Sequence, residues 1–218
     1  MERTIRTRYG PIHAHVEGKG PAILLAHGSH PENTWQVWEN NVAALAQAGF
    51  SVYALDLVGY GQSGGRILEH PRQAQAVLDV LDAGGMQTAT LGGVSWGGMV
   101  VLEVALAHPE RVERLILVDS AGAGVYSEDD LETIACPVLV VWGEDDSVIP
   151  LANAAWFGAT LPNCHVETIP DVTLGEGVPA WGGHHPMRFK PEEFNRIAIH
   201  FLLTPGPMRS IILHGPRP

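Results

Sequence analysis

The sequence predicts one α/β domain with a doubly wound, mostly parallel sheet and helices on both of its faces. Short apolar runs with strand character alternate with stretches of helical spacing through most of the chain. Some of these runs, such as Ala22 to Ala26, are continuously apolar, which is typical of strands covered on both faces. A length of 218 residues, with 45% hydrophobic and 17% charged residues, suits one domain with a substantial core.

The predicted elements begin with an antiparallel pair of strands, Arg3 to Tyr9 and Ile12 to Val16, around a Gly-Pro turn. Further strands are predicted at residues 22–26, 50–57, 88–94, 112–118, 137–142 and 165–169. Helices are predicted at residues 35–48, 71–83, 99–108, 128–134, 151–161 and 191–203. We therefore expect a single domain over residues 1–203 and a C-terminal tail over residues 204–218.

Composition and charge argue against several classes of partner. The formal net charge is −11 and no block rich in lysine or arginine is present, so no nucleic-acid partner is expected. The N-terminus lacks the apolar region of a secretory signal, and no apolar run reaches the length of a membrane span. We therefore expect a cytoplasmic protein with no membrane partner. The two cysteines, Cys136 and Cys164, are expected to be free, buried thiols.

A glycine-flanked serine joins a predicted strand to a predicted helix. Residues 93–97 read Gly-Val-Ser-Trp-Gly, which is the pattern G-x-S-x-G with Ser95 at its centre. Small residues two positions before and after the serine let strand and helix approach closely, while a strained backbone lifts the serine Oγ clear of the sheet. The helix N-terminus favours negative charge near the serine. The same string also occurs in ordinary glycine-rich turns, so it indicates a nucleophile only together with a base and an acid.

Candidate partners for Ser95 follow two later strands. Residues 143–150 read Gly-Glu-Asp-Asp-Ser-Val-Ile-Pro after the strand at 137–142 and supply Asp145 and Asp146. Residues 183–186 read Gly-His-His-Pro after the last predicted strand and supply His184. A serine nucleophile needs a base, and the base needs a carboxylate to orient it. The chain order is therefore Ser, Asp, His, with each residue after a strand.

With these motifs the chain resembles the α/β-hydrolase superfamily, in particular its small esterases, lactonases and C–C hydrolases. The resemblance covers residues 22–203. It includes His-Gly at 27–28, D-x-x-G-x-G-x-S at 56–64, the Ser95 turn, residues 143–150 and residues 183–186. It implies Ser95 as nucleophile, His184 as general base and Asp146 as orienting acid, because the family pattern places the acid four residues before a proline. It also implies an oxyanion hole made by the backbone N–H groups of Ser29 and Trp96.

Other residues offer alternatives to these assignments. Asp145 is a neighbouring candidate for the acid, and Asp119 follows another strand, where it would serve as the acid or brace the strand end. His185 is interpreted as a packing or rim residue, and His27 as structural in the oxyanion turn. Surface or cap roles are expected for His13, His15, His70, His108, His165, His200 and His214. No zinc-ligand spacing is present, so no metal is expected.

Two segments depart from the family pattern. Only residues 120–135 separate the strand ending near Asp119 from the next strand, so we expect a minimal cap or none. The stretch of residues 171–183 before His184 is longer than usual and is rich in glycine, which suits an adaptable loop over the site. Its one large apolar side chain, Trp181, is the candidate substrate-binding residue.

The predicted function is hydrolysis of carboxylic esters of small substrates through an acyl-enzyme, with no cofactor. The partner expected is a small-molecule ester. Lactone hydrolysis, thioester hydrolysis and C–C bond cleavage would use the same triad and stay open. Epoxide hydrolase and haloalkane dehalogenase chemistry would need a carboxylate at position 95. A non-catalytic ligand-binding relative is the alternative from another class, and such relatives generally enclose the ligand with a cap.

Overall fold

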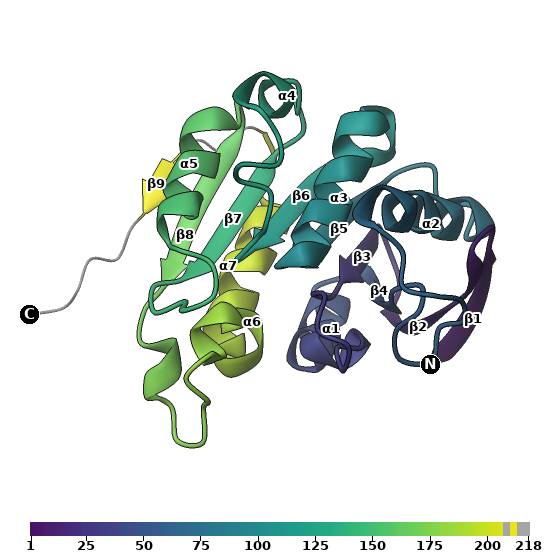
Figure 1. The fold of residues 1–218 in the computed structure, drawn as a ribbon, viewed down its shortest axis with the longest axis horizontal. Coiled ribbons are helices and arrows are strands. Elements are labelled where there is room, and N and C mark those ends of the chain that lie inside the picture. The colour runs from purple at the N-terminus through teal and green to yellow at the C-terminus, as the bar shows by residue number, and fades with distance from the viewer. Residues whose placement is uncertain (207–209, 213–218) are drawn as a thin grey trace, which may run out of the picture.

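The computed structural model describes residues 1–206 and 210–212, and within them a nine-stranded sheet with the order β1-β2-β4-β3-β5-β6-β7-β8-β9 (Figure 1). The strands are β1 (Glu2–Thr7), β2 (Gly10–Gly18), β3 (Ala22–Ala26), β4 (Ser51–Asp56), β5 (Ala89–Val94), β6 (Val112–Val118), β7 (Val138–Gly143), β8 (Cys164–Ile169) and β9 (Ser210–Ile212). The α-helices are α1 (Glu39–Gln47), α2 (His70–Ala83), α3 (Trp96–Ala107), α4 (Glu128–Glu132), α5 (Ala152–Thr160), α6 (Pro186–Phe189) and α7 (Pro191–Leu203).

The sheet is parallel except at its N-terminal edge. Strands β1 and β2 form the predicted hairpin, with Thr7 opposite Gly10, and β2 pairs antiparallel with β4. The pairs from β4 through β3, β5, β6, β7 and β8 to β9 are all parallel. This arrangement confirms the predicted doubly wound sheet, and it brings the carboxyl ends of β3, β5, β6 and β7 to one edge.

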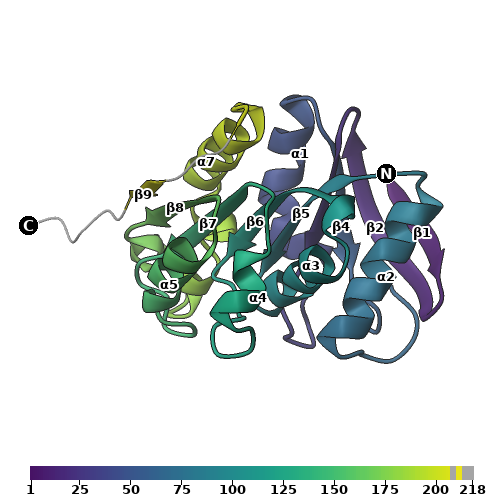
Figure 2. The ribbon, with the colours of Figure 1, turned by 90° about the horizontal axis from the view of Figure 1, so that it is seen from above.

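Helices cover both faces of the sheet. Figure 2 shows α1 and α7 on one face and α2, α3, α4 and α5 on the other. Side chains alternate between the two cores as strand geometry requires, because successive residues of a strand point to opposite faces. In β3, for example, Leu24 belongs to the core under α2 and α3, whereas Ile23 and Leu25 belong to the core under α1 and α7. All three are essentially fully buried, which stabilises the fold by about 1.5–3 kcal/mol for each such side chain.

The helix predicted over residues 35–48 divides into two parts. A 3₁₀ turn, η1 (Trp35–Trp38), begins at Thr34, whose side chain accepts a hydrogen bond from Gln36 N, and α1 follows it. Helix α3 begins at Trp96, three residues earlier than predicted. Two glycines in its first turn concealed this start, since glycine is a poor helix former.

The two segments that depart from the family pattern contain only short helical elements. Between β6 and β7 the structure contains α4 as its one helix, which is consistent with a minimal cap. The link from β8 to α7 contains two 3₁₀ turns, η3 (Val172–Leu174) and η4 (Gly182–His184), and then α6. In the tail, residues 210–212 add strand β9 beside β8, with Ser210 opposite His165.

Two of the expected surface histidines are buried. His13 is 4% exposed and its Nδ1 lies 2.9 Å from Asp56 Oδ2, while His165 is 4% exposed and its Nε2 lies 3.0 Å from Glu167 Oε1. The prediction of surface roles is wrong for both, because Asp56 on β4 bonds the His13 ring, and Glu167 and Ser210 bond the His165 ring. Cys164 is buried, as expected, but Cys136 is a free thiol that is only partly buried, so the prediction of two buried thiols is wrong for Cys136. Among the described residues, no helix is long and apolar enough to cross a membrane. His214 lies outside the described residues.

Candidate active site

Ser95 occupies a sharp turn between β5 and α3 in a strained backbone conformation. Its φ of 56° and ψ of −123° lie where residues other than glycine are rarely found. Three backbone hydrogen bonds hold the turn: Ser95 N donates to Val118 O at 2.9 Å, and Ser95 O accepts from Gly98 N and Ala121 N at 3.0 Å each. Such strain costs roughly 1–3 kcal/mol and persists only where the surroundings fix it. The predicted elbow is therefore present, with β6 and the loop after it as its supports.

The glycines around Ser95 allow three backbone segments to approach one another. A Cβ on Gly93 would collide with Gly97 O, and a Cβ on Gly97 would lie 2.6 Å from Ala26 O. A Cβ on Gly28 would lie 3.3 Å from Ser95 Cβ. The small residues two positions before and after the serine are therefore needed for packing, as the motif implies.

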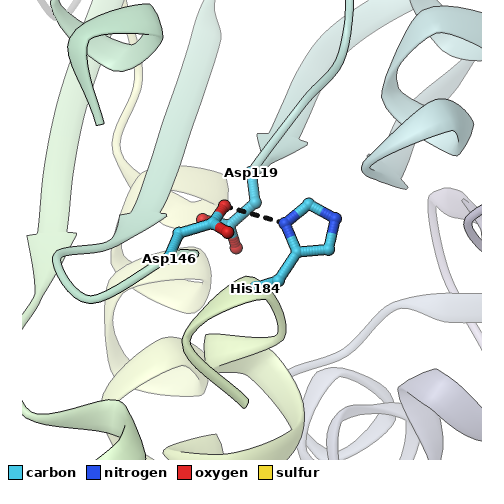
Figure 3. Close-up of side chains that lie close together, drawn as sticks. All are labelled: Asp119, Asp146 and His184. Atoms are coloured by element: carbon cyan, nitrogen blue, oxygen red, sulfur yellow. Dashed lines mark hydrogen bonds and ion pairs between the residues drawn. The ribbon is translucent and has the colours of Figure 1, made fainter. Parts of the chain in front are cut away.

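His184 is paired with Asp146 (Figure 3). Its Nδ1 lies 2.7 Å from Asp146 Oδ2, and the other carboxylate oxygen, Oδ1, accepts hydrogen bonds from Val148 N at 2.7 Å and Ile149 N at 3.1 Å. The Asp146 side chain is fully buried and that of His184 is 6% exposed. A hydrogen bond from Nδ1 to the carboxylate leaves Nε2 as the ring nitrogen free to accept a proton.

Ser95 and His184 line the same cavity, which has a volume of about 790 Å³. Within the described part of the chain, no hydrogen bond joins Ser95 Oγ to His184 Nε2. Such bonds are often long in a structure without substrate and tighten only when substrate binds. Of the three residues predicted from the sequence, His184 and Asp146 are thus hydrogen-bonded to each other. Ser95 lines the same cavity as His184 but is not bonded to it in the described structure.

The two alternative acids make different contacts. Asp145 Oδ2 accepts a hydrogen bond from Thr173 N at 2.6 Å, so its carboxylate holds the long loop rather than His184. Asp119, directly after β6, is fully buried, and its Oδ1 accepts a hydrogen bond from Gly143 N at 2.9 Å. Asp119 therefore braces the end of the neighbouring strand β7, whereas the sequence predicted that it would brace the end of its own strand.

Asp119, Asp146 and His184 also have the residue types that bind metal ions. One ligand atom of each lies within 4.8 Å of the other two, and Figure 3 shows the three side chains converging. A metal bound by a histidine nitrogen and a carboxylate oxygen needs about 2 Å to each. His184 Nδ1 and Asp146 Oδ2 lie 2.7 Å apart and bond directly, so an ion between them would have to break that bond. This arrangement fits a hydrogen-bonded pair better than a metal site.

The loop expected to form the oxyanion hole is held by a neutral histidine. His27 is fully buried; its Nδ1 lies 2.8 Å from Gly28 O, and its Nε2 accepts a hydrogen bond from Leu57 N at 3.0 Å. Burial lowers the pKa of His27 to about 4, so the ring is neutral and donates from Nδ1. His27 is structural, as predicted, because it ties the residue before Ser29 to the end of β4.

The two expected oxyanion donors belong to the loop after β3 and to the first turn of α3. Ser29 lines the cavity next to Gly28, and its carbonyl accepts a hydrogen bond from Tyr60 Oη at 3.1 Å. Trp96 is the first residue of α3, so its N–H has no partner within the helix. This placement is compatible with two N–H groups near one face of Ser95.

The comparisons with known proteins agree with this geometry. Residues 21–135 match the family model described as alpha/beta hydrolase fold. The chain is 32% identical to the 2-hydroxy-6-oxo-6-phenylhexa-2,4-dienoate hydrolase of Comamonas testosteroni, in an alignment that covers 88% of this chain and 91% of that relative. The chain belongs to the α/β-hydrolase family. In fold, this α/β hydrolase is similar to a serine hydrolase of Cycloclasticus zankles, with a TM-score of 0.82, 20% identity, and coverage of 93% of this chain and 97% of that one.

Other relatives correspond to this α/β hydrolase over only part of their length. The chain is 41% identical to the bifunctional epoxide hydrolase 2 of Rattus norvegicus over 105 residues, which are 46% of this chain and 19% of that protein. It spans 55% of the 2-hydroxy-6-oxo-6-phenylhexa-2,4-dienoate hydrolase of Burkholderia cepacia. These matches therefore support the family, whereas the activities of the whole relatives do not transfer with them.

The cavity of this α/β hydrolase includes residues that the sequence did not reveal. Trp181 and His185 line it as expected, and their rings lie 5.4 Å apart in an edge-to-face arrangement. The lining also contains Gly28, His30, Glu32, Asn33, Val148 and Arg188. Arg188 follows the Gly-His-His-Pro motif by two residues, and this proximity was the one signal that could have identified it. Its helix, α6, is anchored to α1 by Asn41 Nδ2, which donates to Met187 O at 2.8 Å.

His185 is uncharged beside the proposed base. Burial, together with the nearby charges of His184 and Arg188, lowers the pKa of His185 to about 3. Its Nδ1 is buried without a hydrogen-bond partner among the described residues. The expected packing or rim role is consistent with this placement, because a neutral ring can pack edge-on against both Trp181 and His184.

Proposed function

We propose that this α/β hydrolase cleaves carboxylic esters of small molecules through an acyl-enzyme. The observation that carries the proposal is the placement of Ser95 at a strained elbow facing the cavity that also contains His184, with Asp146 bonded to the far side of the His184 ring. A serine, a base and an orienting carboxylate in this order are the parts that acyl transfer needs.

In the proposed mechanism Ser95 Oγ attacks the carbonyl carbon while His184 Nε2 takes its proton. Asp146 holds the Nδ1–H tautomer and stabilises the imidazolium that forms. The N–H groups of Ser29 and Trp96 stabilise the oxyanion, and each such donor contributes roughly 3–4 kcal/mol to barrier reduction. His184 then protonates the leaving alcohol, and a water activated by the same nitrogen releases the acid.

The proposal is tested with the purified protein, a fluorophosphonate probe and short-chain p-nitrophenyl esters. We expect the probe to label wild type and not Ser95→Ala. We also expect ester turnover to fall by up to roughly 10⁶-fold in Ser95→Ala while the circular dichroism spectrum is unchanged, because only the nucleophile is removed. Ester turnover by pure Ser95→Ala protein at the wild-type rate would refute the mechanism.

Of the activities named in the relatives, epoxide hydrolysis fits this chain least. Epoxide opening by this fold would need a carboxylate nucleophile, and position 95 is a serine. Lactone and thioester hydrolysis use the same attack on a carbonyl carbon, so the same triad would serve them. A panel containing an ester, a lactone and a thioester of matched acyl chain measures this preference directly.

Hydrolysis of a C–C bond in an acidic substrate is the second candidate, and a specific residue favours it. The Comamonas testosteroni relative is named for a dienoate, which carries a carboxylate. Arg188 lines the cavity of this chain, and among the described residues it has no ion pair with a carboxylate; its guanidinium carbon lies 5.8 Å from the Phe189 ring centre. A guanidinium that has no carboxylate partner in the described chain is suited to bind a substrate carboxylate.

This second candidate predicts a charge preference that Arg188 controls. We expect Arg188→Gln to raise KM for substrates with a free carboxylate, such as a dienoate or the monoester of a dicarboxylic acid, and to leave KM for the neutral diester unchanged. Lys190→Gln removes a charge from the same segment but not from the cavity lining, so it is the matched control. Equal effects of Arg188→Gln on charged and neutral substrates would contradict this candidate.

A further inference from the structure

Asp119 is a buried carboxyl group that the proposed mechanism does not use. It is fully buried and has a φ of 42°, one of three positive values among non-glycine residues of the described chain. Its Oδ1 accepts a hydrogen bond from Gly143 N, but its Oδ2 is buried and has no hydrogen-bond partner within the described part of the chain. Among the described residues, no lysine, arginine or histidine forms an ion pair with it. Bracing β7 explains one of its two oxygens and leaves the other unexplained.

Asp119 lies close to two other aspartates, Asp146 and Asp145, so its surroundings carry negative charge. Atoms of Asp119 and Asp146 lie within 4.8 Å of each other and of His184, and the negative charge of Asp145 also acts on Asp119. Two buried carboxylates this close cannot both carry a charge at low cost, so one of them holds a proton. Among the groups that face Asp119, His184 is the one that becomes positively charged, and it is bonded to Asp146.

The hydrogen bonds decide which of the two carboxyl groups holds the proton. Asp146 accepts from two backbone N–H groups and is paired with His184, all of which favour its ionised form. Asp119 accepts from one backbone N–H. Burial raises the pKa of Asp119 well above its usual value, and the charge of Asp146 raises it further, against the opposing effect of Gly143 N–H. The proton therefore belongs on Asp119.

We propose that Asp119 is a positioning residue, a neutral carboxyl group whose Oδ2–H donates a hydrogen bond to the Asp146 carboxylate and holds it against His184. The inference rests on the proposed function, because it assigns Asp146 as the acid of the triad. It accounts for both oxygens of Asp119: one fixes β7 and the other fixes the carboxylate after β7. It also means that Asp119 is a donor and not a second acceptor for His184.

The strained backbone of Asp119 is compatible with this role and selects the right variant. Asparagine tolerates positive φ better than other residues with a Cβ. In Asp119→Asn the amide oxygen accepts from Gly143 N and the NH₂ group donates to Asp146, so the variant mimics a neutral carboxyl. We expect Asp119→Asn to keep kcat/KM within about 3-fold of wild type near pH 7, a change small beside the roughly 10⁴-fold loss seen when a triad acid is neutralised.

A variant that removes the donor gives the opposite result. Asp119→Gly relieves the strain at φ but leaves Asp146 without its fourth hydrogen bond, the one from Asp119. We expect kcat to fall by roughly 10²-fold with KM nearly unchanged, since a small misplacement of the triad affects the transition state. Rescue by asparagine and not by glycine separates a positioning role from a purely steric one. A loss as large in Asp119→Asn as in Asp119→Gly would overturn the proposal, because it would mean that a charged Asp119 is required.

The protonation state can be measured without any activity. Carboxyl ¹³C NMR of protein labelled at aspartate should show one aspartate that stays neutral near pH 7 in wild type and that disappears in Asp119→Asn, or in Asp119→Gly if the first variant does not fold. Asp145→Asn is the matched control and should keep this signal. An Asp119 signal that titrates with the ordinary carboxyl groups overturns the proposal. The measurement can also be made on Ser95→Ala, so its outcome is distinguishable from failure of the proposed function.

Discussion

At the scale of single residues, two adjacent carboxylates hold different parts of the molecule. Asp146 Oδ2 lies 2.7 Å from His184 Nδ1, whereas Asp145 Oδ2 accepts from Thr173 N in the loop before the histidine. We expect Asp146→Asn to lower kcat by roughly 10⁴-fold, because an amide in this place favours the wrong tautomer of the ring. Asp145→Asn should leave kcat within about 10-fold and act mainly on the loop. Steady-state kinetics of both variants provide the test, and a larger loss in Asp145→Asn would contradict the assignment.

His27 gives a residue-scale prediction for stability against pH. The unfolded chain binds a proton at His27 near its ordinary pKa of about 6.5, but burial lowers the pKa of the folded state to about 4. Between these values the folded state binds fewer protons than the unfolded state, so the contribution of His27 is present above about pH 6.5 and is lost as pH falls toward 4. Urea unfolding of wild type should show this decrease.

The His27 contribution is isolated with two variants. His27→Gln keeps one donor and one acceptor but does not titrate in this range, so its stability should fall less steeply with pH than that of wild type. His108→Gln replaces a histidine whose side chain is 43% exposed and should follow the wild-type curve. Parallel curves for wild type and His27→Gln would show that His27 is not a neutral buried group.

The residues of the site differ in how far the sequence could identify them. Ser95, Asp146 and His184 each follow a strand in a recognisable local pattern, and strand ends of a parallel sheet meet at one edge. The geometry places all three there, although their catalytic roles stay predictions. Arg188 and the unpartnered oxygen of Asp119 could not be found in this way, because their surroundings come from segments distant in the sequence. The burial of His13 was missed for the same reason.

At the scale of elements, the long approach to His184 is the part that shapes the cavity. Trp181 is 46% exposed and lines the cavity, and its ring also lies 5.6 Å from that of Phe189. If acyl chains lie on this ring, Trp181→Ala should remove binding shared by ground and transition states. We expect KM to rise by roughly 10-fold for an octanoate ester and less for butyrate and acetate, with little change in kcat, since each additional buried CH₂ contributes about 0.8 kcal/mol.

A matched control for Trp181 lies on the same loop. Leu174 is 77% exposed and is not among the cavity-lining residues. Leu174→Ala should therefore leave KM unchanged for all three esters. An equal rise of KM for the three esters in Trp181→Ala, or loss of folded protein, would indicate that the tryptophan only packs the loop against the domain.

Elements were predictable where the sequence has a clear pattern, either a continuous apolar run or helical spacing over several turns. The continuous apolar runs of β3 and β7 and the strand–turn–helix around Ser95 were identified correctly, because both faces of these strands are buried. The turns η3 and η4 and helix α6 contain three or four residues each, which is too short for a helical period to be visible. Strand β9 consists of three residues within a tail rich in proline and glycine, so only its pairing with β8 reveals it.

At the scale of the whole molecule, the predicted domain boundary at Leu203 precedes strand β9, which pairs with β8 at the edge of the same sheet. Every candidate site residue and both cores lie within residues 1–203, whereas β9 contributes backbone pairing at the edge of β8. We expect a chain ending at Leu203 to fold and to keep kcat/KM within about 2-fold, because none of the site contacts involves the tail. Circular dichroism and ester kinetics measure the two quantities.

Removal of β9 should make the truncated chain more prone to self-association. Without β9, the N–H and C=O groups on the outer edge of β8 have no strand to pair with, whereas those facing β7 stay paired. An open edge strand is a template for pairing with another chain. Light scattering should therefore show concentration-dependent association of the chain ending at Leu203. A chain ending at Gly206 is the control for the helix end, because it keeps Thr204, whose carbonyl accepts a hydrogen bond from Arg114 at 3.0 Å. The chain ending at Gly206 should associate as strongly as the chain ending at Leu203 but melt at a higher temperature. Loss of the native circular dichroism spectrum in both chains would contradict the prediction and show that the domain needs β9 to fold.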